Sequence, residues 1–146
     1  MEVYREYDSV PNAHLLLSSL RSVGYSEETA LADIIDNCIS ASATEIRISF
    51  DWELRKIVIC DNGYGMTEEI LLESMKIGSA DPNEPRSRDD LGRFGMGMKT
   101  AAFSLGKRLT VVSKENGNVS NACWDLERIE KFNQWKMLIL NIDDNI

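Results

Sequence analysis

The segment that most constrains the fold is residues 57–66, where a strand pattern ends at an aspartate and two closely spaced glycines follow. The run Ile-Val-Ile-Cys favours a strand that carries Asp61 to its end. Gly63 and Gly65 can adopt positive φ angles, so the backbone can turn away sharply. A carboxylate held there can accept a hydrogen bond from an adenine amino group; the alternative is a plain Asp-Asn-Gly turn. Met66, the next residue, either packs on a flat base or belongs to the core.

A second pattern lies on a helix that we expect to begin after Ser26 and to run to about Ala41. Its polar residues recur at the spacing i, i+3, i+4 and i+7, which places them in one stripe. Such a stripe is either a thin solvent-exposed face or the wall of a polar cleft. Asp33 can accept a proton from water, and the carbonyl oxygen of Asn37, one turn later, suits Mg²⁺. The stripe consists of Asp33, Asp36, Asn37 and Ser40.

The third pattern is a glycine-rich run, Gly92-Arg-Phe-Gly95-Met-Gly97-Met-Lys-Thr100. It is neither the dinucleotide fingerprint nor a Walker P-loop, because its glycine spacing differs and no Gly-Lys-Ser or Gly-Lys-Thr is present. Glycines allow a close approach of the backbone, and free amides at the start of the following helix attract an anion. This run is therefore interpreted as a phosphate clamp, with a flexible hinge as the alternative.

The remaining elements predict an α+β fold: a two-layer sandwich with a mostly antiparallel sheet and helices on one face. A polar, proline-containing loop at residues 79–91 has no periodicity and is long for a compact domain, so we expect either a functional lid or a disordered segment there. An Asn-Gly turn is expected to join two of the strands. The predicted helices are 14–23, 26–41, 67–75 and 95–105, and the predicted strands are 44–50, 56–61, 108–113, 120–125 and 136–142.

Composition limits the function classes. The 146 residues suit a single domain, and the formal net charge of −8 argues against direct nucleic-acid binding. The three cysteines, Cys38, Cys60 and Cys123, are widely spaced and are interpreted as buried free thiols of a cytoplasmic protein. The acidic start and the lack of a long apolar run predict that there is no membrane contact.

Taken together and in this order, the three patterns resemble the Bergerat-fold (GHKL) ATPases: gyrase B subunits, heat-shock chaperones, sensor histidine kinases, MutL and the microrchidia proteins. The amino-acid sequence of the glycine-rich run is most similar to that of the microrchidia and MutL-like branch. The resemblance implies that ATP and Mg²⁺ are bound, with Asn37 on the metal, Asp61 on adenine, Gly65 close to the base, and Gly95 and Gly97 on phosphates. The residues assigned to the nucleotide by this resemblance are Asn37, Asp61, Gly63, Gly65, Met66, Gly92, Arg93, Phe94, Gly95, Met96, Gly97, Met98, Lys99 and Thr100.

Two positions depart from the family pattern. Asp33 stands where gyrase-like and MutL-like members carry the glutamate that activates water, and Ser40 replaces a second aspartate. The resemblance therefore implies a slow ATPase with Asp33 as catalytic base, in which ATP orders the lid and drives a homodimer contact. Two alternatives remain open: the ATP-binding domain of a histidine-kinase-like protein kinase, and a non-hydrolysing scaffold. The chain is expected to be an N-terminal fragment of a longer protein.

Overall fold

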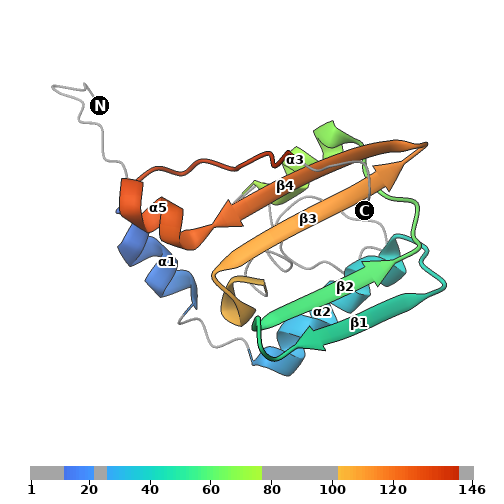
Figure 1. Ribbon diagram of the computed structural model, residues 1–146, viewed down its shortest axis with the longest axis horizontal. Helices are drawn as coiled ribbons and strands as arrows, with labels where there is room; N and C mark the ends of the chain where they lie inside the picture. Colours follow the sequence, from blue (N-terminus) through green and yellow to red (C-terminus); the bar gives the residue numbers. More distant parts are fainter. Residues whose placement is uncertain (1–11, 22–25, 77–101, 142–146) are drawn as a thin grey trace, which may run out of the picture.

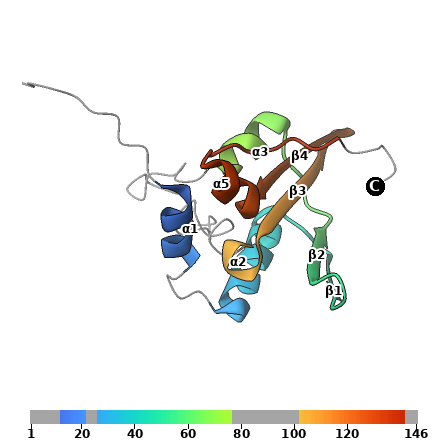
Figure 2. The ribbon, with the colours of Figure 1, turned by 60° about the vertical axis from the view of Figure 1, so that its left-hand side comes forward.

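The computed structural model describes residues 12–21, 26–76 and 102–141. Within them, helices and antiparallel strands form the predicted α+β fold, and Figure 2 shows the helices gathered on one side of the strands. The helices are α1 (Ala13–Arg21), α2 (Glu27–Ser40), α3 (Glu68–Met75) and α5 (Leu126–Phe132), and residues 102–105 are also helical. The strands are β1 (Ile46–Asp51), β2 (Lys56–Asp61), β3 (Arg108–Glu115) and β4 (Asn118–Asp125).

The strands form two antiparallel hairpins, β1-β2 and β3-β4, each a two-stranded sheet within the described residues. In the second hairpin the predicted Asn-Gly turn is confirmed: Asn116 and Gly117 have φ angles of 49° and 85°, and Glu115 pairs with Asn118 on either side. Positive φ at both central residues matches the twist of a tight hairpin. In Figure 1, β2 and β3 run in the same direction, with α2 behind the first hairpin and α3 behind the second.

Polar side chains define the beginnings of the helices as the sequence predicts. The Ser26 side chain accepts a hydrogen bond from the backbone N–H of Thr29, and the Thr67 side chain accepts one from Ile70. Each satisfies a donor that the first helical turn leaves without a partner. Thr67 follows the glycine turn directly, so the beginning of α3 is fixed next to the candidate site.

The hydrophobic core lies between β3-β4 and the helices α1, α3 and α5. Trp124 anchors it, because the residue is 5% exposed and its indole Nε1 donates to the Met75 carbonyl oxygen at 2.8 Å. Elsewhere around this core, the Asn133 side chain accepts a hydrogen bond from the Ala13 backbone N–H at 3.0 Å and joins α5 to α1. The buried members of this core are Ala13, Leu17, Leu71, Met75, Phe103, Ala122, Trp124, Leu126 and Ile129.

The helices, strands and cysteine burial differ from the sequence-based expectation at three points. The expected strand 136–142 is reduced to one bridge, in which Leu138 and Cys123 exchange backbone hydrogen bonds. Helix α5 was not predicted; Asp125 accepts a hydrogen bond from Arg128 N–H at its start. Cys60 is exposed, because its side chain lies on the polar face of the β1-β2 hairpin, whereas Cys38 and Cys123 are buried and all three are free thiols.

No helix in the described part of the chain is both long and apolar enough to cross a membrane.

Candidate nucleotide site

The site is organised by the turn that follows β2, which is fixed to the end of α2 and the start of β1. The Asn62 Oδ1 atom accepts hydrogen bonds from the backbone N–H groups of Thr44 and Glu45 at 2.8 and 2.9 Å. The Tyr64 N–H donates to the Ala41 carbonyl oxygen at 3.0 Å. These contacts join three consecutive elements, so the position of Asp61 is set by the helix as well as by its own strand.

Gly63 and Gly65 are both required by close packing. A Cβ atom on Gly63 would lie 2.7 Å from the Ala41 carbonyl oxygen, and one on Gly65 would lie 2.1 Å from the Lys114 carbonyl oxygen. Gly65 also has a φ angle of +76°, which other L-residues rarely adopt. The predicted turn is therefore present, but only Gly65 has the expected positive φ. Gly63 is required because the turn packs against the end of α2, and at Gly65 the chain packs against the end of β3.

Asp61 faces the helix that carries the polar stripe. Burial raises the pKa of the Cys38 thiol to about 11, and the negative charge of Asp61 and a hydrogen bond to its carboxylate add to this effect. The Asp61 Oδ1 atom also accepts a hydrogen bond from the Gly63 N–H at 2.8 Å. Asp61 therefore lies against α2 at Cys38, a buried position about 100° around the helix from Asn37.

Asp33 and Asn37 occupy neighbouring turns of α2, as the spacing predicts. The Asp33 side chain is half-buried and that of Asn37 is exposed. Among the described residues, no group of three or more His, Cys, Asp or Glu side chains could hold a metal ion. A Mg²⁺ ion at Asn37 would therefore take most of its oxygen ligands from phosphate groups and water, which is how proteins commonly bind Mg²⁺. The side chains of this helix fit that role.

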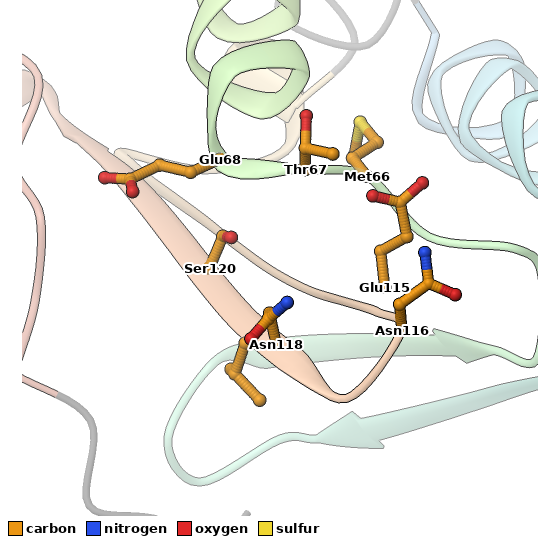
Figure 3. A pocket seen from close by; sticks show the side chains of 8 residues that line it. Met66, Thr67, Glu68, Glu115, Asn116, Asn118 and Ser120 are labelled. Atoms are coloured by element: carbon orange, nitrogen blue, oxygen red, sulfur yellow. The ribbon is translucent and has the colours of Figure 1, made fainter.

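Met66 has a structural role that the sequence left open. Its N–H donates to the Ser113 Oγ atom at 2.8 Å, and its side chain packs against the hydrophobic core. It also lines a pocket of about 540 Å³ between the start of α3 and the end of the β3-β4 hairpin, shown in Figure 3. The other lining residues are Thr67, Glu68, Glu115, Asn116, Asn118, Val119 and Ser120.

That pocket does not include Asp33, Asn37 or Asp61. In Figure 3 the carboxylates of Glu68 and Glu115 lie on its opposite sides. Two carboxylates would repel a triphosphate, because like charges in a partly desolvated site disfavour each other. We therefore place the candidate nucleotide site at the α2 stripe and the Asp61 turn and not in this pocket.

The glycine-rich run, the third of the sequence patterns, falls outside the described residues. It comprises the residues assigned to phosphates, namely Gly92, Arg93, Phe94, Gly95, Met96, Gly97, Met98, Lys99 and Thr100, and it is accompanied there by the expected lid at 79–91. The described part of the site thus brings together the helix stripe and the glycine turn.

A polar helix fixed to a glycine turn at the end of an antiparallel hairpin is the arrangement expected of a GHKL-type ATPase domain. Residues 25–145 match the family described as histidine kinase-, DNA gyrase B- and HSP90-like ATPases, and the chain belongs to this family. It is 28% identical to the ATPase morc-1 of Caenorhabditis elegans over 120 residues, which are 79% of this chain and 14% of that protein.

Two further relatives represent the breadth of the family. The ATPase MORC2B of Mus musculus is 32% identical over 98 residues, covering 62% of this chain and 9% of the relative. The chaperone protein HtpG of Bacillus licheniformis is 38% identical over 88 residues, covering 55% of this chain and 14% of the relative. The chain thus spans 14% or less of the length of each of these proteins.

Two contributors to the site were not singled out from the sequence. Ser113 anchors the backbone at Met66, and Cys38 contacts Asp61. Cys38 carried a usable signal, since it follows Asn37 on the helix that bears the stripe. Ser113 carried none, because its role depends on a contact between residues 47 positions apart.

Proposed function

We propose that this chain is an Mg-ATP-binding domain that hydrolyses ATP slowly, with adenine held at Asp61 and the phosphates beyond Asn37. The proposal is supported by the attachment of the Asp61 turn to the helix that carries the polar stripe: the Tyr64 N–H donates to the Ala41 carbonyl oxygen at 3.0 Å, and Asp61 lies against Cys38. The family assignment supports ATP as the nucleotide, since the matched family is one of ATPases.

The two sides of the proposed site, the Asp61 turn and the α2 stripe, carry different chemical groups, and this difference suits a nucleotide. Asp61 uses its Oδ1 atom on the Gly63 N–H and lies at an exposed strand end, so its carboxylate can also accept from an adenine amino group. Asn37, exposed on α2, offers a neutral oxygen to Mg²⁺. Asp33 lies one turn before Asn37 and is the acid placed to take a proton from an attacking water.

Hydrolysis is proposed to be slow because Asp33 is one methylene shorter than the glutamate of gyrase-like relatives. A misplacement of about 1 Å can cost on the order of a hundredfold in rate. We also propose that bound ATP orders the lid at 79–91 and promotes a homodimer contact in the full-length protein, as the resemblance implies. A cytoplasmic location fits the three free cysteines.

Calorimetric titration of ATP and of a non-hydrolysable analogue, with and without Mg²⁺, tests the proposal directly. Asp61→Asn should weaken ATP binding about tenfold to a hundredfold, because a lost hydrogen bond to a charged group costs roughly 1.5–3 kcal/mol. Glu53→Gln is the matched control: it also removes one carboxylate charge from the same hairpin, in the exposed turn between β1 and β2.

Each outcome has a defined reading. Weaker binding in Asp61→Asn alone supports the site, and equal affinity in all three proteins removes Asp61 from it. ATP binding without release of phosphate in a purified preparation would favour the scaffold alternative. Transfer of the phosphate to a protein residue would favour the kinase alternative.

A further inference from the structure

The outer edge of the β1-β2 hairpin is unpaired within the described residues, since β1 pairs there only with β2. The Asn62 N–H donates to the Glu45 carbonyl oxygen, so residues 45 and 62 form a hydrogen-bonded pair. Antiparallel ladders alternate, which means that odd-numbered residues of β1 direct their backbone groups toward β2. The N–H and C=O groups of Ile46, Ile48 and Phe50 therefore point outward along the free edge.

The same edge exposes apolar side chains. Ile48 is 39% exposed, Phe50 47% and Trp52 83%, and the rings of Phe50 and Trp52 stack with their centroids 5.7 Å apart. Exposed edge strands of this kind are templates for pairing with another strand. Natural proteins often block such edges with proline or inward-pointing charges, and β1 contains no proline.

We propose that β1 pairs antiparallel with β1 of a second copy of this chain, about a two-fold axis at Ser49, to form a four-stranded sheet. In this register Ile48 lies opposite Phe50 of the second copy, and both present outward backbone groups to each other. Arg47 lies opposite Asp51 of the second copy in the non-hydrogen-bonded pair, where side chains approach most closely. The two-fold axis repeats both contacts.

The charges select this register. Only two registers keep five residues of β1 paired and place its outward-facing residues opposite one another: those centred on Ile48 and on Ser49. Centring on Ile48 sets Arg47 opposite Ser49 and forms no ion pair. Centring on Ser49 forms two, because each copy contributes an Arg47 and an Asp51.

Both charged groups have capacity for this contact. Arg47 donates from Nε to Glu45, which leaves its two terminal nitrogens for another acceptor. The Asp51 Oδ1 atom accepts from the Glu53 and Leu54 N–H groups, and its second oxygen can accept from an arginine. This association requires no nucleotide, so its test is independent of the proposed ATP site.

Charge reversal tests the pairing, with sedimentation equilibrium of the purified chain without nucleotide as the measurement. The wild type should double in mass as its concentration rises. Arg47→Asp should weaken dimerisation about tenfold or more, since two attractive pairs become Asp–Asp repulsions. Asp51→Arg should do the same through Arg–Arg repulsions. Arg55→Asp, which makes the same charge change in the turn outside the paired register, should dimerise like the wild type.

The decisive experiment mixes the two single variants. A heterodimer of Arg47→Asp with Asp51→Arg contains two Asp–Arg pairs, so the mixture should recover dimerisation that neither variant has alone. Recovery would also indicate that Asp51→Arg remains folded despite the loss of its turn contacts. A wild type that stays monomeric at all concentrations overturns the proposal, and so does an Arg47→Asp variant that dimerises like the wild type or a mixture that stays monomeric.

Discussion

Among the described glycines, Gly65 leaves the least room for a side chain. It combines a φ angle of +76° with a carbonyl oxygen of Lys114 at 2.1 Å from the position of a Cβ atom. Gly117 has a similar φ angle of +85° but no atom within 4 Å of that position. Comparing an alanine substitution at each of the two glycines therefore distinguishes the cost of backbone strain from the cost of steric overlap.

We predict that Gly117→Ala lowers the free energy of unfolding by about 1–2 kcal/mol, the cost of the left-handed conformation. Gly65→Ala should lower it clearly more, because β3 must also move away from the turn. Urea unfolding followed by circular dichroism measures both. Equal losses in the two variants would mean that the close approach at Lys114 relaxes without cost.

Asn37 gives a second prediction at the residue scale, which rests on the proposed function. Its exposed amide oxygen is the proposed metal ligand on α2, so Asn37→Ala should bind ATP with little dependence on Mg²⁺. Ser40→Ala, one turn later on the same stripe, serves as the control and should keep the wild-type dependence. Calorimetric titration with and without Mg²⁺ makes the comparison. An unchanged effect of Mg²⁺ in Asn37→Ala would exclude this residue as a ligand.

Single residues were predictable where local chemistry decides their conformation. The positive φ at Gly65 followed from glycine's conformational freedom and the cap at Ser26 from its hydroxyl, whereas the positive φ expected at Gly63 was wrong. The exposure of Cys60 was predicted wrongly, because residue type alone does not reveal which face of a hairpin is covered. The contact of Cys38 with Asp61 likewise depends on how a helix packs on a strand.

At the scale of elements, α5 depends on Asp125, which does two things at once. Its side chain accepts from the Arg128 N–H at the start of the helix and from the Arg108 side chain of β3. Burial raises the pKa of Asp125, but the hydrogen bonds from Arg108 and Arg128 outweigh burial and hold the pKa below its ordinary value of 3.8. The ionised form is thus favoured by folding.

A group with a lowered pKa in the folded state stabilises the protein above its unfolded pKa and loses that contribution as pH falls. Asp125→Ala should therefore cost about 1 kcal/mol at neutral pH, and the difference from wild type should shrink below about pH 4. Glu127→Gln, in the exposed pair with Lys107, should change stability by less than about 0.5 kcal/mol. Thermal unfolding across this pH range tests both, and a difference that does not change with pH would contradict the role of the charge.

The sequence predicted seven of the eight helices and strands named here, and the reasons for the errors are physical. Helix α5 has 7 residues, too few for periodicity to reveal, so its only local signal was the aspartate that caps it. The segment 136–142 alternates like a strand, but its hydrogen bonds near Leu140 come from the Asn121 side chain, which donates to the Leu140 carbonyl and accepts from its N–H. A side-chain amide there takes the place of the strand ladder.

At the scale of the whole molecule, burial is unequal. The hydrophobic core joins β3-β4 to α1, α3 and α5, whereas α2 buries only Ala30 and Cys38, and β1 and β2 contain no fully buried residue. The proposed nucleotide site thus lies on the less buried half of the described fold. Binding sites that respond to a ligand are commonly drawn from the less stable parts of a domain.

This division predicts the pattern of amide hydrogen exchange. Without nucleotide, α2 and the β1-β2 hairpin should exchange faster than β4 and α3, which the hydrogen bond from Trp124 to the Met75 carbonyl oxygen ties together. If the proposed site is correct, Mg-ATP should slow exchange mainly in α2 and in residues 61–66, because a ligand that binds only the folded state opposes local opening there. Asp61→Asn, given the same nucleotide concentration, should lose most of that slowing while keeping the pattern of the free protein. Equal protection of both halves in the free chain would contradict the unequal burial, and slowing spread evenly over β3 and β4 would place the nucleotide elsewhere.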